Sequence, residues 1–205
     1  MEERLREQMS FALELDKEKL INRQTHLSGH GRYENDAEHA WHMAVMAWIL
    51  REYANEPVDI ARTMLMCLLH DVVEIDAGDT FAYDTEALKT QKAREDAAKE
   101  RIFGLLPADQ KTELIRVFDE FEANETPEAR FAHALDNLQP LMLNHSNGGS
   151  DWKEHYITEK QVRNRHSKTQ LGSETLFQLT NRILEECLNA GLIHPDEGET
   201  PAENM

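Results

Sequence analysis

The chain of 205 residues carries 39 acidic and 22 basic side chains, which give a formal net charge of −17 at pH 7. A surface of this charge repels phosphate-coated polymers, so we exclude nucleic acid as a partner. No apolar run approaches the ~18 residues that a membrane span needs, and the charged N-terminus lacks the apolar centre of a secretory signal. We therefore expect a cytoplasmic protein without membrane contact, with one domain over 1–193 and an acidic, disordered tail over 194–205.

Helix signals dominate the first half of the chain. Residues 3–21 are charged with interspersed leucines, which favours a helix. Asn35 and Glu38 have the spacing of a capping box and predict a helix from Ala37 to about Tyr53. Pro57 begins the next predicted helix, which runs to Gly78.

The second half repeats this pattern. Further helices are expected over 85–103, from Pro107, from Pro127 with a kink at Pro140, and over 174–190. Residues 144–157, with Trp152 and His155, are expected to form the longest irregular loop. No segment shows the alternation of a strand. The sequence thus predicts an all-α fold, a single bundle of about seven to eight helices.

Cys67 and Cys187 are the two cysteines of the chain, and each lies among apolar residues. Two isolated cysteines form neither a disulfide framework nor a thiolate metal site. We expect two buried free thiols in a reducing compartment.

His70-Asp71 is the sharpest chemical signal, because this ionisable pair follows the apolar run MLMCLL. Burying such a pair costs free energy unless a partner compensates. A divalent cation compensates well, since it binds neutral imidazole and ionised carboxylate. The alternative is a helix-terminal pair held only by hydrogen bonds.

Two further residues extend this signal to a complete ligand set. His39 lies in the first turn of an apolar helix, where His42 is a competitor for its role, and Asp136 is flanked by leucines. A buried arginine or a helix N-terminus would be the alternative partner of Asp136. Together with His70-Asp71, these residues offer four nitrogen or oxygen ligands and leave positions open for water and substrate, as a catalytic site requires.

Glu74 lies four residues after His70 and, on a continuing helix, would share its face. A carboxylate there is placed to orient or deprotonate an attacking water. Asp79 follows Gly78 at the predicted helix exit. The alternative is that both are solvated acids, because the chain has 39 acidic residues.

The segments AEHAWHM, LLHDVVEIDAGD and ALDNLQPLML resemble the H…HD…D signature of the HD-domain superfamily of metal-dependent phosphohydrolases. The spacing of His70, Asp71, Glu74 and Asp79 resembles, more narrowly, the 5′-deoxynucleotidases and a prokaryotic branch of HD-domain hydrolases. The resemblance covers roughly residues 10–190 and implies an HD-domain helical bundle.

The resemblance also implies roles for individual residues. The implied metal ligands are His39, His70, Asp71 and Asp136. Glu74 would position or activate the attacking water, and Arg23 would orient the substrate phosphate. Asp79 and Thr80 would meet the nucleoside sugar. The characterised bacterial deoxynucleotidases have a tryptophan directly after that arginine, whereas this chain has Gln24, which we expect to weaken discrimination between ribose and deoxyribose.

We therefore predict a divalent-metal-dependent phosphomonoester hydrolase, most simply a 5′-nucleotidase acting on (deoxy)nucleoside 5′-monophosphates. The alternatives are hydrolysis of a nucleoside triphosphate, a cyclic nucleotide or a sugar phosphate, and a nucleotide-binding regulatory HD protein with little activity. One metal ion is expected, and two His with two Asp suit Mn, Co, Zn, Ni or Fe, with Mg also possible. Amphipathic helices without an obvious partner and the resemblance lead us to expect a homodimer.

Overall fold

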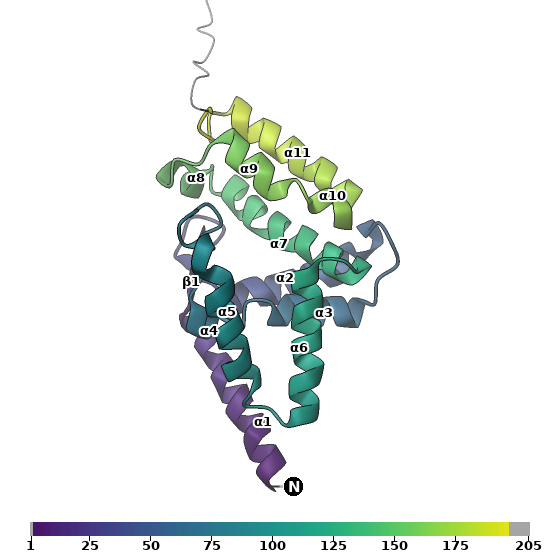
Figure 1. The fold of residues 1–205 in the computed structure, drawn as a ribbon. Helices are drawn as coiled ribbons and strands as arrows, with labels where there is room; N and C mark the ends of the chain where they lie inside the picture. The colour runs from purple at the N-terminus through teal and green to yellow at the C-terminus, as the bar shows by residue number, and fades with distance from the viewer. Residues whose placement is uncertain (1, 197–205) are drawn as a thin grey trace, which may run out of the picture.

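The computed structural model describes residues 2–196, and most of them are helical. The long helix α7 (Pro127–Ser146) runs through the centre of the molecule (Figure 1). Helices α2 (Asp36–Leu50) and α3 (Ile60–Leu69) pack against it, and α10 (Thr169–Gly172) and α11 (Glu174–Asn189) cover it from the other side. The all-α prediction is confirmed.

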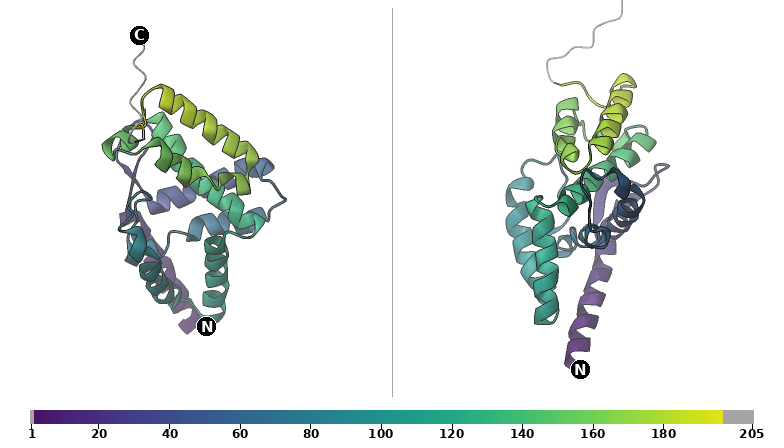
Figure 2. Two further views of the ribbon diagram at one scale, coloured as in Figure 1. Left: turned by 45° about the horizontal axis from the view of Figure 1, so that its top comes forward. Right: turned by 90° about the vertical axis from the view of Figure 1, so that its right-hand side faces the viewer.

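Three further helices extend away from this centre (Figures 1 and 2). Helix α6 (Ala108–Ala123) contacts both α3 and α7, and α5 (Leu88–Phe103) packs beside it. Helix α1 (Glu2–Glu14) joins them through Phe11, whose ring lies 6.0 Å from that of Phe103. The described residues contain no helix that is both long and apolar enough to cross a membrane.

The predicted capping box at the start of α2 is confirmed. The Asn35 side chain accepts a hydrogen bond from the Glu38 backbone amide at 3.0 Å, and the Glu38 carboxylate accepts one from the Asn35 amide at 3.2 Å. These two bonds satisfy amides that a helix N-terminus leaves without partners. They fix the first turn of α2, where His39 lies fully buried.

Two helices predicted as continuous are interrupted. Helix α1 ends at Glu14 and a 3₁₀ segment, η1 (Leu15–Leu20), follows it. Beyond α3, residues 70–73 form a turn before the short helix α4 (Glu74–Ala77). In this turn the Glu74 amide donates to the Asp71 carbonyl at 2.8 Å, a tighter bond than the i to i−4 bond of a helix.

The expectation of no strands was wrong in one place. Strands β1 (Asn22–His26) and β2 (Tyr33–Asn35) form an antiparallel pair in which His26 faces Tyr33. The two strands have only 5 and 3 residues, and these residues are mostly polar and partly buried. They therefore show no alternation of apolar and polar positions in the sequence. This hairpin precedes α2 and carries Arg23 and Gln24 toward α7.

The long loop expected over 144–157 was also wrong. Helix α7 continues through Pro140 to Ser146, and α8 (Ser150–Glu154) occupies much of the remainder. The unpredicted helix α9 (Glu159–His166) follows and begins at its own capping box. Gly149, with φ of +68°, begins α8 in the left-handed conformation that glycine adopts without a steric penalty.

One apolar core joins these helices. Its largest fully buried side chains come from α2, α3, α5, α7 and α11, and they include Met43, Met66, Phe103, Phe131 and Leu184. Cys67 and Cys187 are buried free thiols, as predicted. Most of the predicted tail, residues 197–205, lies outside the described residues, and the domain boundary at 193 stays a prediction.

Candidate metal centre and adjoining cavity

The four predicted metal ligands come together from helices α2 and α7 and from the turn after α3. His39 Nε2 of α2 lies 3.2 Å from Asp136 Oδ1 of α7. His70 Nε2, directly after α3, lies 3.9 Å from the same oxygen and 3.1 Å from Asp71 Oδ2. Asp71 Oδ2 is in turn 3.9 Å from His39 Nε2. One ligand atom each from His39, His70 and Asp136 therefore lies within 4.8 Å of the others. Asp71 Oδ2 borders this group through the two imidazoles and also contacts Arg23 Nη1 at 2.6 Å.

The other nitrogen of each imidazole fixes its orientation. His39 Nδ1 donates to Gln139 Oε1 at 2.9 Å, and His70 Nδ1 donates to the Cys67 carbonyl at 2.9 Å. Each ring thereby presents Nε2 toward the two carboxylates. Such bonds commonly set the tautomer of histidines that bind metals.

The chemistry of these donors suits a divalent cation. Burial and the charge of Arg23 lower the pKa of His39 to about 4, which leaves its Nε2 lone pair available at neutral pH. His70 Nε2 is buried 3.1 Å from Asp71 Oδ2. Burial lowers the pKa of His70, but Asp71 and Asp136 outweigh it and raise this pKa to about 9, so a bound cation would displace a proton from this nitrogen. Burial raises the pKa values of Asp71 and Asp136, but neighbouring positive charges outweigh it and hold both below the ordinary value. Neutral imidazole and ionised carboxylate are the forms that bind metal.

Arg23 is buried beside this centre and is committed to carboxylates. Its Nη1 lies 2.6 Å from Asp71 Oδ2 and 3.4 Å from Asp36 Oδ1. The three side chains are 13%, 12% and 0% exposed, so water screens these ion pairs little. Arg23 is therefore the counter-ion of a buried acidic group, in addition to its predicted role toward phosphate.

Glu74 belongs to that acidic group. One oxygen each from Asp36, Glu74 and Asp79 lies within 4.8 Å of the others. Glu74 is buried, its Oε2 has no hydrogen-bond partner, and burial together with the charges of Asp71 and Asp36 raises its pKa well above the ordinary value. A raised pKa makes the carboxylate form of a side chain a stronger base, which suits a group that takes a proton from water.

A cavity of about 380 Å³ opens over the centre. This volume falls within the range of ~300–1,000 Å³ that is typical of small-molecule sites. The predicted residues Arg23, Gln24, Asp79 and Thr80 line it beside His70, Asp71, Glu74 and Asp136. Its apolar wall is formed by Phe81, Tyr83, Phe121, Leu141 and Trp152.

Comparison with known protein families identifies the family of the chain. Residues 15–176 match the family described as HD domain. The chain belongs to the HD domain family.

Relatives of the chain carry more specific names. The HD domain chain is 30% identical over 111 residues to the human 5′-deoxynucleotidase HDDC2, covering 54% of the chain and 53% of that relative. It is 31% identical over 109 residues to the Xenopus laevis protein of the same name, covering 53% of each. The chain thus spans about half the length of the curated relatives that it matches.

A solved structure is similar over almost the whole chain. The crystal structure of a predicted metal-dependent phosphohydrolase from Magnetospirillum magnetotacticum is 47% identical to the HD domain chain, with a TM-score of 0.91. The match covers 95% of this chain and 97% of that one. At this identity the likeness extends beyond the arrangement of helices to the sequence itself.

Sequence reasoning missed Arg165 in the HD domain. This residue of α9 donates from Nη2 to Asp136 Oδ2 at 3.0 Å. Its side chain is 39% exposed and lines the cavity, whereas Arg23 is 13% exposed. No local signal indicated Arg165, because α9 itself was not predicted.

Sequence reasoning also missed Gln139, which holds His39. Its Nε2 donates to Glu34 Oε1 at 2.7 Å and lies 3.1 Å from His42 Nδ1. His42 thus contacts Gln139, which orients His39, whereas His39 itself belongs to the cluster of candidate ligands. The spacing of Gln139, three residues after Asp136 on a helix, was a usable signal that both share one face.

Proposed function

We propose that this HD domain protein is a metal-dependent phosphohydrolase that acts as a 5′-nucleotidase on nucleoside 5′-monophosphates, deoxy forms included. The observation that carries the proposal is the convergence of His39, His70 and Asp136, with Asp71 beside the two imidazoles, beneath a cavity of about 380 Å³. The name of the 5′-deoxynucleotidase relatives and the description of the similar solved structure support it.

One divalent ion would be held by the side chains of His39, His70, Asp71 and Asp136. When bound, such an ion neutralises phosphoryl oxygens and lowers the pKa of an attacking water toward ~7. Nitrogen and oxygen ligands of this kind suit Mn, Co, Zn, Ni or Fe better than Mg, which prefers oxygen.

Glu74 is proposed to take the proton of the attacking water. Its Oε2 is buried without a hydrogen-bond partner, and its neighbour Arg23 opposes the rise of its pKa. An unpartnered carboxylate oxygen beside the ligand set is free to receive that proton. The structure thus gives Glu74 an environment different from that of Asp71 and Asp136, whose pKa values are lowered.

Two arginines are proposed to serve the phosphate differently. Arg165 faces the cavity with part of its guanidinium exposed, so its free N–H groups are available to phosphate oxygens. Arg23 orients the phosphate in the role that the family resemblance implies, and its short contact with Asp71 also fixes that ligand. Both arginines line the cavity, so a terminal phosphate bound there would interact with two cationic side chains.

The nucleoside is proposed to contact Gln24, Asp79 and Thr80. Thr80 Oγ1 accepts a hydrogen bond from Arg94 at 2.8 Å, which orients its hydroxyl at the cavity wall. A glutamine amide donates to or accepts from a ribose hydroxyl, so Gln24 tolerates the 2′-hydroxyl. The aromatic wall would receive the base.

The direct test is phosphate release from a panel of esters with Mn²⁺, Co²⁺, Zn²⁺ and Mg²⁺. The panel contains AMP, dAMP, a nucleoside triphosphate, a cyclic nucleotide and a sugar phosphate. We expect AMP and dAMP to react faster than the others. Preference for another ester would identify that ester as the substrate class instead. If no ester reacts, the remaining interpretation is a regulatory nucleotide-binding protein. The homodimer stays a prediction, which light scattering of the purified protein checks.

A further inference from the structure

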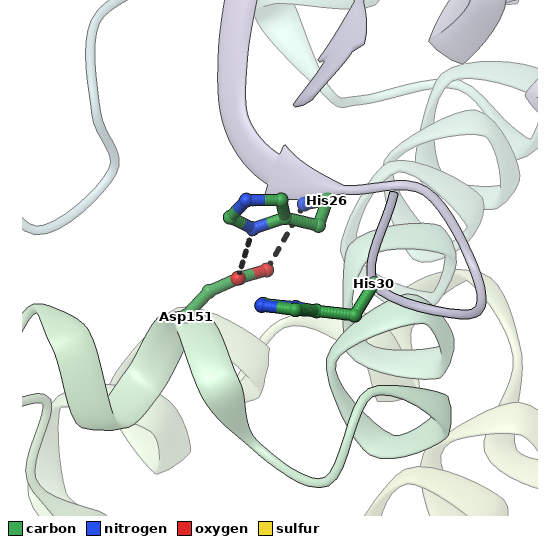
Figure 3. A group of neighbouring side chains, drawn as sticks. All are labelled: His26, His30 and Asp151. Atoms are coloured by element: carbon green, nitrogen blue, oxygen red, sulfur yellow. Dashed lines mark hydrogen bonds and ion pairs between the residues drawn. The ribbon is translucent and has the colours of Figure 1, made fainter. Parts of the chain in front are cut away.

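A second cluster of metal-ligating side chains lies outside the proposed catalytic centre. It consists of His26 at the end of β1, His30 in the connection to β2, and Asp151 in α8 (Figure 3). One ligand atom from each lies within 4.8 Å of the others. No residue is shared with the proposed catalytic ligands.

Asp151 is the buried member of this cluster and is only 4% exposed. Its Oδ1 lies 2.6 Å from His26 Nδ1, and its Oδ2 accepts a hydrogen bond from the His26 backbone amide at 3.1 Å. A buried carboxylate requires a compensating partner, and a histidine or a cation fills that need.

His30 is brought to the cluster by its backbone. Its φ of +54° is left-handed, an uncommon conformation for a residue other than glycine. The His30 amide donates to Asn147 Oδ1 at 2.9 Å, and Asn147 Nδ2 donates to the His26 and Leu27 carbonyls, each at 3.1 Å. Asn147 thereby anchors the connection, and Figure 3 shows a nitrogen of the exposed His30 ring on the Asp151 side.

We propose that His26, His30 and Asp151 form a second metal site, selective for Zn²⁺ and similar transition metals. A tetrahedral Zn²⁺ with bonds of ~2.0–2.2 Å places its ligand atoms ~3.3 Å apart. The contact of 2.6 Å between His26 and Asp151 would open slightly, and the exposed His30 ring would close on the ion. Two imidazoles favour Zn²⁺ over Mg²⁺ or Ca²⁺, which prefer oxygen.

An ion at this site would brace one edge of the cavity. Asp151 and Trp152 line the cavity from α8, and Gln24 and Thr25 line it from β1, directly before His26. These two segments are far apart in the sequence and meet at the cluster. A shared ligand set would therefore tie the hairpin to α8 and limit their separation.

Zinc uptake by the purified protein tests the proposal without any substrate, so its outcome is independent of the proposed nucleotidase activity. Dialysis against Zn²⁺ in excess Mg²⁺, followed by elemental analysis, compares wild type with His30→Asn. Asparagine adopts left-handed φ values readily, so this variant keeps the backbone of the connection. His145→Asn is the matched control, because His145 is also exposed and lies outside the cluster.

We expect His30→Asn to retain about one zinc ion fewer per chain than wild type, and His145→Asn to equal wild type (one ion follows from one three-ligand site). Circular dichroism checks that both variants keep their helices. Equal zinc content in wild type and His30→Asn would overturn the proposal.

Discussion

Replacing Arg23 by glutamine should show how much the buried ion pairs of Arg23 with Asp71 and Asp36 contribute to the stability of the fold. Arg23→Gln leaves Asp71 and Asp36 without their partner at 2.6 and 3.4 Å, in surroundings where the side chains are at most 13% exposed. Removing one member of a buried ion pair costs ~3–5 kcal/mol. For a chain of this size, that loss corresponds to a fall in melting temperature of about 6–20 °C.

Urea unfolding of the metal-free protein measures this loss, and Arg32→Gln is the control. Arg32 pairs with Glu38 at the surface, where the side chains are 59% and 35% exposed, so its loss should cost only ~0–1 kcal/mol. Saturating Mn²⁺ should reduce the defect of Arg23→Gln, because a cation then neutralises Asp71. A defect no larger than that of Arg32→Gln would refute the counter-ion role.

Three further predictions concern single side chains. Glu74→Gln should retain its metal by elemental analysis but lose ~10²–10⁴-fold in kcat, and loss of the metal would make Glu74 a ligand instead. Gln24→Trp should lower kcat/KM for AMP relative to dAMP by up to ~10²-fold, and an unchanged ratio would show that this position does not set sugar selectivity. Burial, followed by the charge of Asp71, raises the pKa of Glu18 from 4.5 to about 7, a difference of at most ~3 kcal/mol. The contribution of Glu18 to the free energy of unfolding is therefore fully present below pH 4.5 and is lost as the pH rises through 7. Metal-free Glu18→Gln should therefore gain stability relative to wild type between pH 4 and pH 8, and parallel pH profiles in urea unfolding would contradict this.

The convergence of the candidate ligands was predictable because each of these residues carries a local signal. His70-Asp71 follows an apolar run, His39 follows a capping box, and Asp136 interrupts an apolar helix face. Their convergence required only that the three helices share one core. The backbone that positions Glu74 differs from the prediction, because a turn with i to i−3 hydrogen bonds replaces the expected continuous helix there.

The contacts made by distant polar segments were not predictable. Arg165 contacts Asp136 from α9, whose sequence is so polar that no buried face is evident in it. Only the tertiary packing of α9 near α7 brings the two residues together. The pairing of β1 with β2 likewise depends on tertiary contacts, because its few polar residues have no strand pattern. Both features adjoin the site, where local sequence preferences are often overridden.

The most direct test of a metal-dependent phosphohydrolase built on these ligands is phosphate release from dAMP before and after metal removal, in wild type and His70→Ala. We predict that chelation abolishes release by wild type, that Mn²⁺ or Co²⁺ restores it, and that His70→Ala stays inactive with either metal while keeping its helical circular dichroism. Undiminished release by the metal-free wild type, or by His70→Ala, would contradict the account.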